Sequence, residues 1–309
     1  MIEIGKQYTD EDNRFDHSGF RAKARLHQSK YRAEVLKLPF ERYGNYLKQA
    51  DAELGKNFYP DFNIFSAVKS YRKYGVALYS NMLRSEHIPF NFFVPLRYDL
   101  NLCKAVFNSI LPNCIKSIPK QATIDGKENL KIEFAPKPKE EYLKDRTSFD
   151  TYIEYDHVDG SKGIIGIEVK YTELGYKISG KTEEDAIKNI NSKYYVVSEK
   201  CGLYNSNCYS TLILDDFRQI WRNQLLGESI LQHKSDLFKH FTSVIFFPEG
   251  NQHFKNSTKE YISLLKIQNK FIPVKYEDYF RLLKAYSKDM RYNNWINYLH
   301  DRYIVFHSE

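Results

Sequence analysis

The sequence predicts an α/β protein in which a mixed β-sheet is flanked by helices and a helical N-terminal portion packs on this core. Two stretches, 149–155 and 164–171, are rich in aromatic and β-branched residues and indicate strands. Asp159, Gly160 and Gly163 between them are turn-forming residues, which favour a hairpin. Longer segments with apolar residues every three or four positions precede and follow this hairpin and indicate helices.

The composition is that of a folded chain with a moderate preference for anionic partners. Of the 309 residues 42% are hydrophobic and 16% aromatic, which excludes disorder and allows one large domain or two. The net charge of +7 favours a polyanionic partner. No run of 18 apolar residues and no signal-peptide core occurs, so we expect a cytoplasmic protein without a membrane partner.

The N-terminal part is predicted to be helical and basic. Residues 1–19 are polar and predict a loosely ordered arm, and residues 20–43 predict a helix rich in Arg and Lys. The basic side chains of that helix either contact phosphates of a partner or form a solvated helix face. Residues 62–84 have the spacing of a core helix or a broken pair of helices. We therefore divide the chain into a basic helical arm, residues 1–60, packed on a core, residues 61–309.

The remaining elements complete the sheet and its helical layers. The run 242–247 is continuously apolar, as in a central strand buried on both faces, and should lie beside the hairpin. Residues 131–134 should form the first strand of the sheet, and a helix should start at Thr182. The other predictions are helices over 98–111, 215–233, 257–266 and 276–286, a strand over 271–274, and a helix or strand over 293–306.

The hairpin places three charged residues near one edge of the sheet. Glu168 and Lys170 share one face of their strand because side chains alternate along it. A strict two-residue turn at Asp159 and Gly160 would set Asp150 opposite Val169, on the wrong face. We therefore predict an odd-length connection or a bulge, which sets Asp150 opposite Glu168 or Lys170.

These three side chains suit metal-assisted hydrolysis of a phosphodiester. Carboxylate oxygens of Asp150 and Glu168 are ligands that Mg²⁺ prefers, with Mn²⁺ as a substitute and the carbonyl of Val169 as a further oxygen. Such a cation lowers the pKa of a water and neutralises charge on a phosphate. Lys170 would orient the water or stabilise the charge that develops.

Asp150, 17 intervening residues (151–167) and then Glu168-Val169-Lys170 resemble the motif of the PD-(D/E)XK nuclease superfamily. Phe149 stands where the proline of that name would be. The order of elements is similar as well. The segments LRSEHIPFNFFVPL (83–96) and WRNQLL (221–226) resemble a bacterial, restriction-endonuclease-like branch.

This resemblance implies a restriction-endonuclease-like core and a magnesium-dependent phosphodiesterase that cuts DNA internally, in a restriction or defence role. It also implies auxiliary residues. Glu86, in the segment similar to the family, is the candidate for an extra carboxylate from a helix, with Glu34 as its rival. Gln224 and Arg222 are candidates for positioning substrate or water.

Several alternatives remain at this point. The fold suits a catalytically silent nucleic-acid-binding protein or an RNA-directed nuclease as well. A homodimer, and a methyltransferase partner if the role is restriction, are left open. The four cysteines form no CxxC pair and the nine histidines do not cluster in the sequence as metal ligands, so we expect no zinc site.

Overall fold

The computed structural model describes residues 2–7, 19–71, 79–178 and 180–305. The arm predicted over residues 1–19 and the middle of the helix predicted over 62–84 lie largely outside the described residues.

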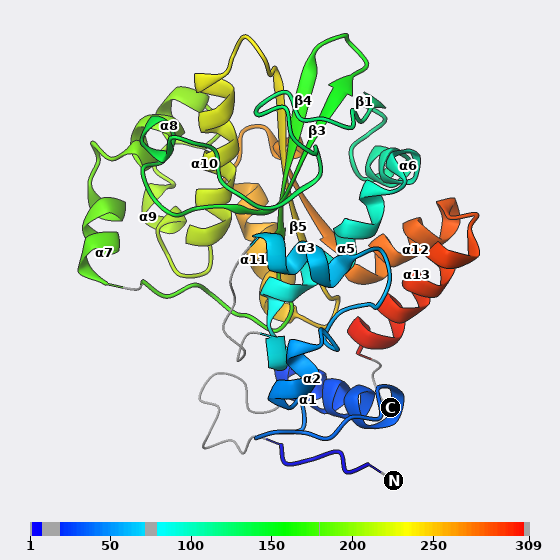
Figure 1. Ribbon diagram of the computed structural model, residues 1–309. Coiled ribbons are helices and arrows are strands. Elements are labelled where there is room, and N and C mark those ends of the chain that lie inside the picture. Colours follow the sequence, from blue (N-terminus) through cyan, green and yellow to red (C-terminus); the bar gives the residue numbers. More distant parts are fainter. Residues whose placement is uncertain (1, 8–18, 72–78, 179, 306–309) are drawn as a thin grey trace.

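A six-stranded mixed sheet forms the centre of the molecule (Figure 1). Its strands are β1 (Ile115–Ser117), β2 (Lys131–Phe134), β3 (Phe149–His157), β4 (Lys162–Val169), β5 (His240–Phe247) and β6 (Phe271–Lys275). The order is β1-β3-β4-β5-β6, and β2 also pairs with β3. The hairpin β3–β4 is antiparallel, whereas β4–β5 and β5–β6 are parallel. The fold is thus the predicted α/β class, with helices at the N-terminus and a restriction-endonuclease-like sheet.

Helices cover both faces of this sheet and bury its apolar side chains. The helices of the described residues are α1 (Phe20–Lys30), α2 (Gln49–Glu53), α3 (Ile64–Tyr71), α5 (Ile88–Phe93), α6 (Leu100–Ile110), α7 (Lys181–Lys188), α8 (Lys193–Cys201), α9 (Tyr209–Leu212), α10 (Arg218–His233), α11 (Gln252–Ser263), α12 (Tyr276–Tyr286) and α13 (Met290–Tyr303). In Figure 1, α8 and α10 lie on one side of the sheet and α6, α12 and α13 on the other. Each side has its own apolar cluster, so the sheet is buried between two cores.

The hairpin register confirms the prediction of an odd-length connection. Thr151 pairs with Ile167, and Asp156 pairs with Lys162, which leaves the five residues 157–161 between the last paired positions. Continued by one residue beyond Thr151, the same register sets Asp150 opposite Glu168. Opposed residues point to the same face, so these two carboxylates share one side of the sheet.

The basic N-terminal helix is shorter than predicted and buries part of its charge. After α1 a π-helical turn (Tyr31–Val35) follows, and the helix ends there. Arg25 and Arg32 are buried, and Arg32 donates hydrogen bonds to the carbonyls of Gly44 and Ile4. Arg32 therefore joins the helix to the N-terminal segment 2–7, since a buried guanidinium needs such partners.

One further element differs from the sequence predictions. β1 precedes residues 131–134, so these residues are not the first strand; with three residues, β1 is too short to show a periodic pattern. For the last segment, where a helix and a strand were both left open, the structure shows the helix α13. The segment between Pro89 and Pro95 is buried and belongs to α5 and the turn after it.

The division at residue 60 stays a prediction. Ala24 and Leu47, from the proposed arm, belong to the same apolar cluster as Ile165 and Phe246 of the sheet.

Candidate active site

Asp150, Glu168 and Lys170 lie together at the end of the hairpin remote from its turn. Asp150 is the second residue of β3, Glu168 is near the end of β4, and Lys170 directly follows β4. Glu168 and Lys170 are each 6% exposed, although both carry charge. Charged side chains are buried in proteins only where partners compensate them, so their contacts are informative.

Three side chains donate hydrogen bonds to the carboxylate of Glu168. Lys170 Nζ lies 2.5 Å from Oε1, and Gln219 Nε2 donates to the same oxygen at 2.6 Å. Asn223 Nδ2 donates to Oε2. Gln219 also accepts from Lys170 Nζ at 2.7 Å, so its amide bridges the acid and the base. Gln219 and Asn223 are one turn apart on α10, which places both amides over the end of β4.

The surroundings of Asp150 disfavour the ionised form of its carboxyl group. Its Oδ2 accepts the backbone N–H of Val169 at 2.7 Å. Burial first, and then the negative charge of Glu168, raise the pKa of Asp150 well above its ordinary value. The positive charge of Lys170 opposes this rise without cancelling it. Two carboxylates close together in a poorly solvated place disfavour each other's ionised form.

Lys170 keeps its charge in this setting. Burial acts to lower its pKa, but Glu168, Asp150 and Glu173 outweigh burial and raise the pKa above the ordinary value. The value therefore depends on the negative charge at these carboxylates. Burial alone would favour the neutral amine.

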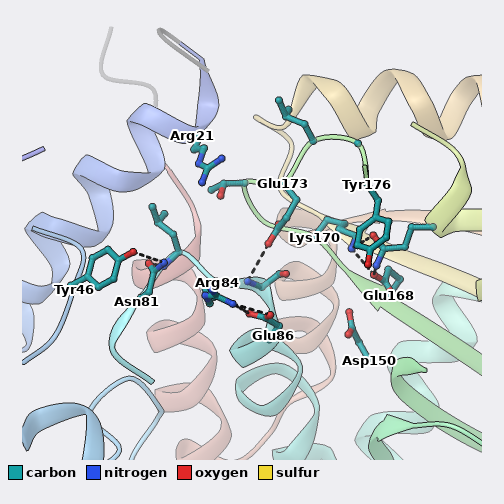
Figure 2. Close-up of a pocket in the computed structure, with 16 residues that line it drawn as sticks. Arg21, Tyr46, Asn81, Arg84, Glu86, Asp150, Glu168, Lys170, Glu173 and Tyr176 are labelled. Atoms are coloured by element: carbon teal, nitrogen blue, oxygen red, sulfur yellow. Dashed lines mark hydrogen bonds and ion pairs between the residues drawn. The ribbon is translucent and has the colours of Figure 1, made fainter. Parts of the chain in front are cut away.

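The three residues line a cavity of about 500 Å³ (Figure 2). Glu86, Arg84 and Glu173 come to it from neighbouring segments. Glu173 accepts the N–H of Ser85 at 3.2 Å and that of Tyr171 at 2.7 Å, so it ties the segment after β4 to the one before α5. Arg21 of α1 and Tyr176 also line the cavity. The cavity thus combines four carboxylates with three basic side chains.

The helical carboxylate predicted from the sequence lies at this cavity. Glu86 is in a 3₁₀ turn (Ser85–His87) and forms an ion pair of 3.1 Å with Arg84. Its rival Glu34 is exposed and is not among the described residues that line the cavity. The structure thus brings Glu86, and not Glu34, to Asp150 and Glu168.

Of the two candidates on α10, the structure brings one near the site. Arg222 contacts Asp145, Glu183 and Thr147 and lines a smaller adjoining cavity of about 150 Å³, which Asp150 and Glu168 also line. Gln224 instead is buried and donates to Glu228 at 3.1 Å, and it is not among the described residues lining either cavity. One residue along a helix turns a side chain by about 100°, which separates Gln224 from Asn223.

Sequence reasoning missed Gln219, Asn223, Glu173 and Glu133. Gln219, Arg222 and Asn223 form a polar ridge at three- and four-residue steps, a pattern that was present in the sequence. Glu133 lies in β2, lines the smaller cavity and contributes to the raised pKa of Asp150, after the larger effects of burial and Glu168. Its backbone has φ +53°, a left-handed conformation that is uncommon outside glycine and concentrates at functional sites.

Two of the histidines, which lie far apart in the sequence, meet in the structure, and the expectation of no zinc site stays a prediction. His157 and His240, 83 positions apart, stack with ring centroids 3.8 Å apart beside Asp159. Only the pairing of β5 with the hairpin brings them together, which is why their sequence spacing did not show it.

A mixed sheet whose hairpin presents Asp and Glu-x-Lys to a polar cavity defines a restriction-endonuclease-like nuclease core. A family model described as the PD-(D/E)XK nuclease superfamily matches residues 10–305, and the chain belongs to this superfamily. Neither curated proteins nor solved structures give a match. Among the described residues no helix is both long and apolar enough to cross a membrane.

Proposed function

We propose that this nuclease is a metal-dependent endonuclease that hydrolyses DNA phosphodiester bonds with Mg²⁺, or with Mn²⁺ in its place. The observation that carries the proposal is the convergence of Asp150, Glu168 and Lys170 on one cavity of about 500 Å³. Nucleases of this superfamily use divalent metals, which agrees with this donor set.

The residues fit a hard divalent cation. Asp150 and Glu168 offer carboxylate oxygens, which Mg²⁺ prefers to nitrogen or sulfur. Burial first, and then the negative charge of Glu168, raise the pKa of Asp150, and a cation would compensate that negative charge. When bound, the cation lowers the pKa of a water and offsets charge on the phosphate. Glu86, which lines the same cavity, would add a further carboxylate.

The chain's own residues bind and orient the reacting groups. Lys170, kept protonated by its acidic neighbours, donates hydrogen bonds to the attacking water and stabilises negative charge developing on the phosphate. Gln219 and Asn223 hold the Glu168 carboxylate in one orientation, and Gln219 also holds the ammonium of Lys170. These contacts keep the acid and the ammonium preorganised.

DNA suits the basic side chains of the cavity and the net charge of the chain. Arg21 and Arg84 line the cavity beside the carboxylates and would contact phosphates next to the one that is cut. The net charge of +7 favours association with a polyanion. RNA carries the same phosphates, so the test includes it as a substrate.

The biological setting is part of the proposal. A restriction or defence nuclease in the cytoplasm needs a methyltransferase partner if host DNA is to be spared by methylation. Cutting both strands at one place is simplest with two active sites, as in a homodimer. Light scattering of the chain with and without DNA measures whether it forms a homodimer.

The proposal is tested by cleavage of supercoiled plasmid, single-stranded DNA and RNA with Mg²⁺ or Mn²⁺. Asp150→Ala and Lys170→Ala should each lower the rate by at least about 100-fold. Lys162→Ala is the matched control. Lys162 lies on β4, the strand that carries Glu168, and pairs with Asp156 at 3.0 Å, far from the cavity. This variant should cleave at the wild-type rate.

Cleavage that a chelator stops and that both site variants lose supports the proposal. If the chain cleaves RNA and not DNA, RNA replaces DNA as the proposed substrate. Binding without cleavage, or cleavage unchanged in both variants, would assign the chain to the catalytically silent nucleic-acid-binding proteins.

A further inference from the structure

A second cluster of ligating side chains lies at the turn end of the hairpin. His157 Nδ1 is 2.9 Å from Asp159 Oδ1, and His240 Nε2 is 2.8 Å from Asp159 Oδ2. Among the described residues this is a group of three metal-ligating side chains whose ligand atoms all lie within 4.8 Å of one another. We call it the His157–Asp159–His240 cluster.

Two elements far apart in the chain build this cluster. His157 ends β3, Asp159 is in the connection, and His240 is the first residue of β5, where it pairs with Gly163 of β4. Strand β4 runs from this end to Glu168, over six residues or about 20 Å. The cluster is therefore separate from the nuclease cavity and does not depend on the proposed function.

The carboxylate of Asp159 is held in place before any ligand arrives. Its Oδ1 accepts from Ser161 N at 2.9 Å and from Ser161 Oγ at 2.6 Å. Such bonds to a ligating carboxylate fix its orientation toward the metal. The backbones that carry the stacked rings are also fixed, because β3 pairs with β4 and β4 pairs with β5.

His157 Nδ1 has two polar neighbours that compete for it. Its Nδ1 lies 3.1 Å from the N–H of Asp159 and 2.9 Å from a carboxylate oxygen. One ring nitrogen cannot accept from the first and donate to the second at the same time. The lone pair of Nδ1 can hold either the Asp159 N–H or a cation, so a bound cation would replace that hydrogen bond and be shared with the Asp159 carboxylate.

We propose that His157, Asp159 and His240 form a binding site for a transition-metal ion of the zinc type, which clips the hairpin turn to the start of β5. Two imidazoles and one carboxylate suit Zn²⁺, Co²⁺ or Ni²⁺, whereas Mg²⁺ prefers oxygen ligands. Bonds of about 2.0–2.2 Å place tetrahedral ligands about 3.4 Å apart, so small side-chain rotations complete the site. Water takes the fourth position because His240 and Asp159 are partly exposed.

The expected consequence is a more stable protein in the presence of the ion. The clip joins residues about 80 positions apart, and an ion that binds only the folded state stabilises it. At an ion concentration about 100 times the Kd, the Tm should rise by about 5 °C.

The test is titration of the full chain with Co²⁺ and with Zn²⁺ in millimolar Mg²⁺, followed by visible absorption and thermal unfolding. Asp150→Ala serves as background so that the nuclease cavity does not contribute. On this background we compare His240→Ala, His157→Ala and Asp159→Asn. The matched control is His233→Ala, since His233 pairs with one carboxylate, Glu141, and is 34% exposed against 31% for His240.

We expect one equivalent of Co²⁺ to bind with visible absorption bands. The three cluster variants should bind it at least tenfold more weakly, and the control variant should bind it unchanged. The rise in Tm is compared with and without ion within each variant, so a loss of basal stability does not obscure it. No bands, or bands and a Tm rise that survive in all three cluster variants, would overturn the proposal.

Discussion

The carboxyl group of Asp150 lies where burial and a second carboxylate both disfavour its charge. Because its pKa is raised above that of the unfolded chain, its ionisation lowers stability as pH rises from the ordinary aspartate range through the raised pKa. Asp150→Asn keeps an oxygen for the Val169 N–H and removes the charge. In the absence of metal we expect it to increase the free energy of unfolding at pH 8 by about 1 kcal/mol, and not at pH 4.

Urea denaturation in the presence of a chelator, at pH 8 and at pH 4, measures this free energy of unfolding. Asp156→Asn is the control on the same strand, because a hydrogen bond from Ser117 and then Lys162 lower the pKa of Asp156. Its ionised form contributes stability above the ordinary aspartate pKa, so this variant should be less stable at pH 8. Destabilisation by Asp150→Asn at pH 8 would contradict the account of the site.

Asn223 and Gln224 are adjacent amides with different expected roles. Asn223 donates to Glu168, whereas Gln224 donates to Glu228. Asn223→Ala should raise the Mg²⁺ concentration for half-maximal cleavage by about tenfold, because an unsupported carboxylate holds a metal less well. Gln224→Ala should leave this concentration unchanged. The reverse pattern would make Gln224, and not Asn223, the amide that supports the metal site.

At the scale of elements, α10 lies very close to β5 at Gly227. A Cβ atom at this position would be 2.0 Å from the ring of Phe241. Gly227→Ala should therefore lower the free energy of unfolding by about 1–3 kcal/mol, although alanine favours a helix by up to about 1 kcal/mol elsewhere. Thermal unfolding measures the loss. Phe241→Leu combined with Gly227→Ala should recover part of it, and stability equal to wild type in the single variant would contradict this packing.

The elements were predicted to different degrees, for physical reasons. The hairpin, β5, β6 and α12 follow from strong local patterns, and the hairpin register follows from the need to place two carboxylates on one face. β1 has too few residues to carry a pattern. The orientation of α10 about its axis depends on which ridge packs on the sheet, so Gln219 and Asn223 could not be told from Gln224.

At the scale of the whole molecule, the positive charge should make DNA binding depend on salt. For a cleavage-deficient Lys170→Ala chain, log K should fall linearly with log salt concentration, with a slope of about −0.9 per phosphate contacted. Arg21→Ala should reduce the slope by about one, because Arg21 lines the cavity. Arg281→Ala on α12 is the control, being exposed and paired with Asp278. Equal slopes in all three chains would exclude Arg21 from the DNA contact.

The sequence by itself determined the α/β class, the hairpin, and the grouping of Asp150 and Glu168 on one face with Lys170 beside them. These depend on residues close in the chain and on the two-residue period of a strand. Only the tertiary structure decided that Glu86, Glu173 and Arg21 share one cavity, that Gln219 and Asn223 hold Glu168, and that His157 meets His240. Those meetings depend on how helices dock and on which strands become neighbours, and such long-range packing leaves no local pattern in the sequence.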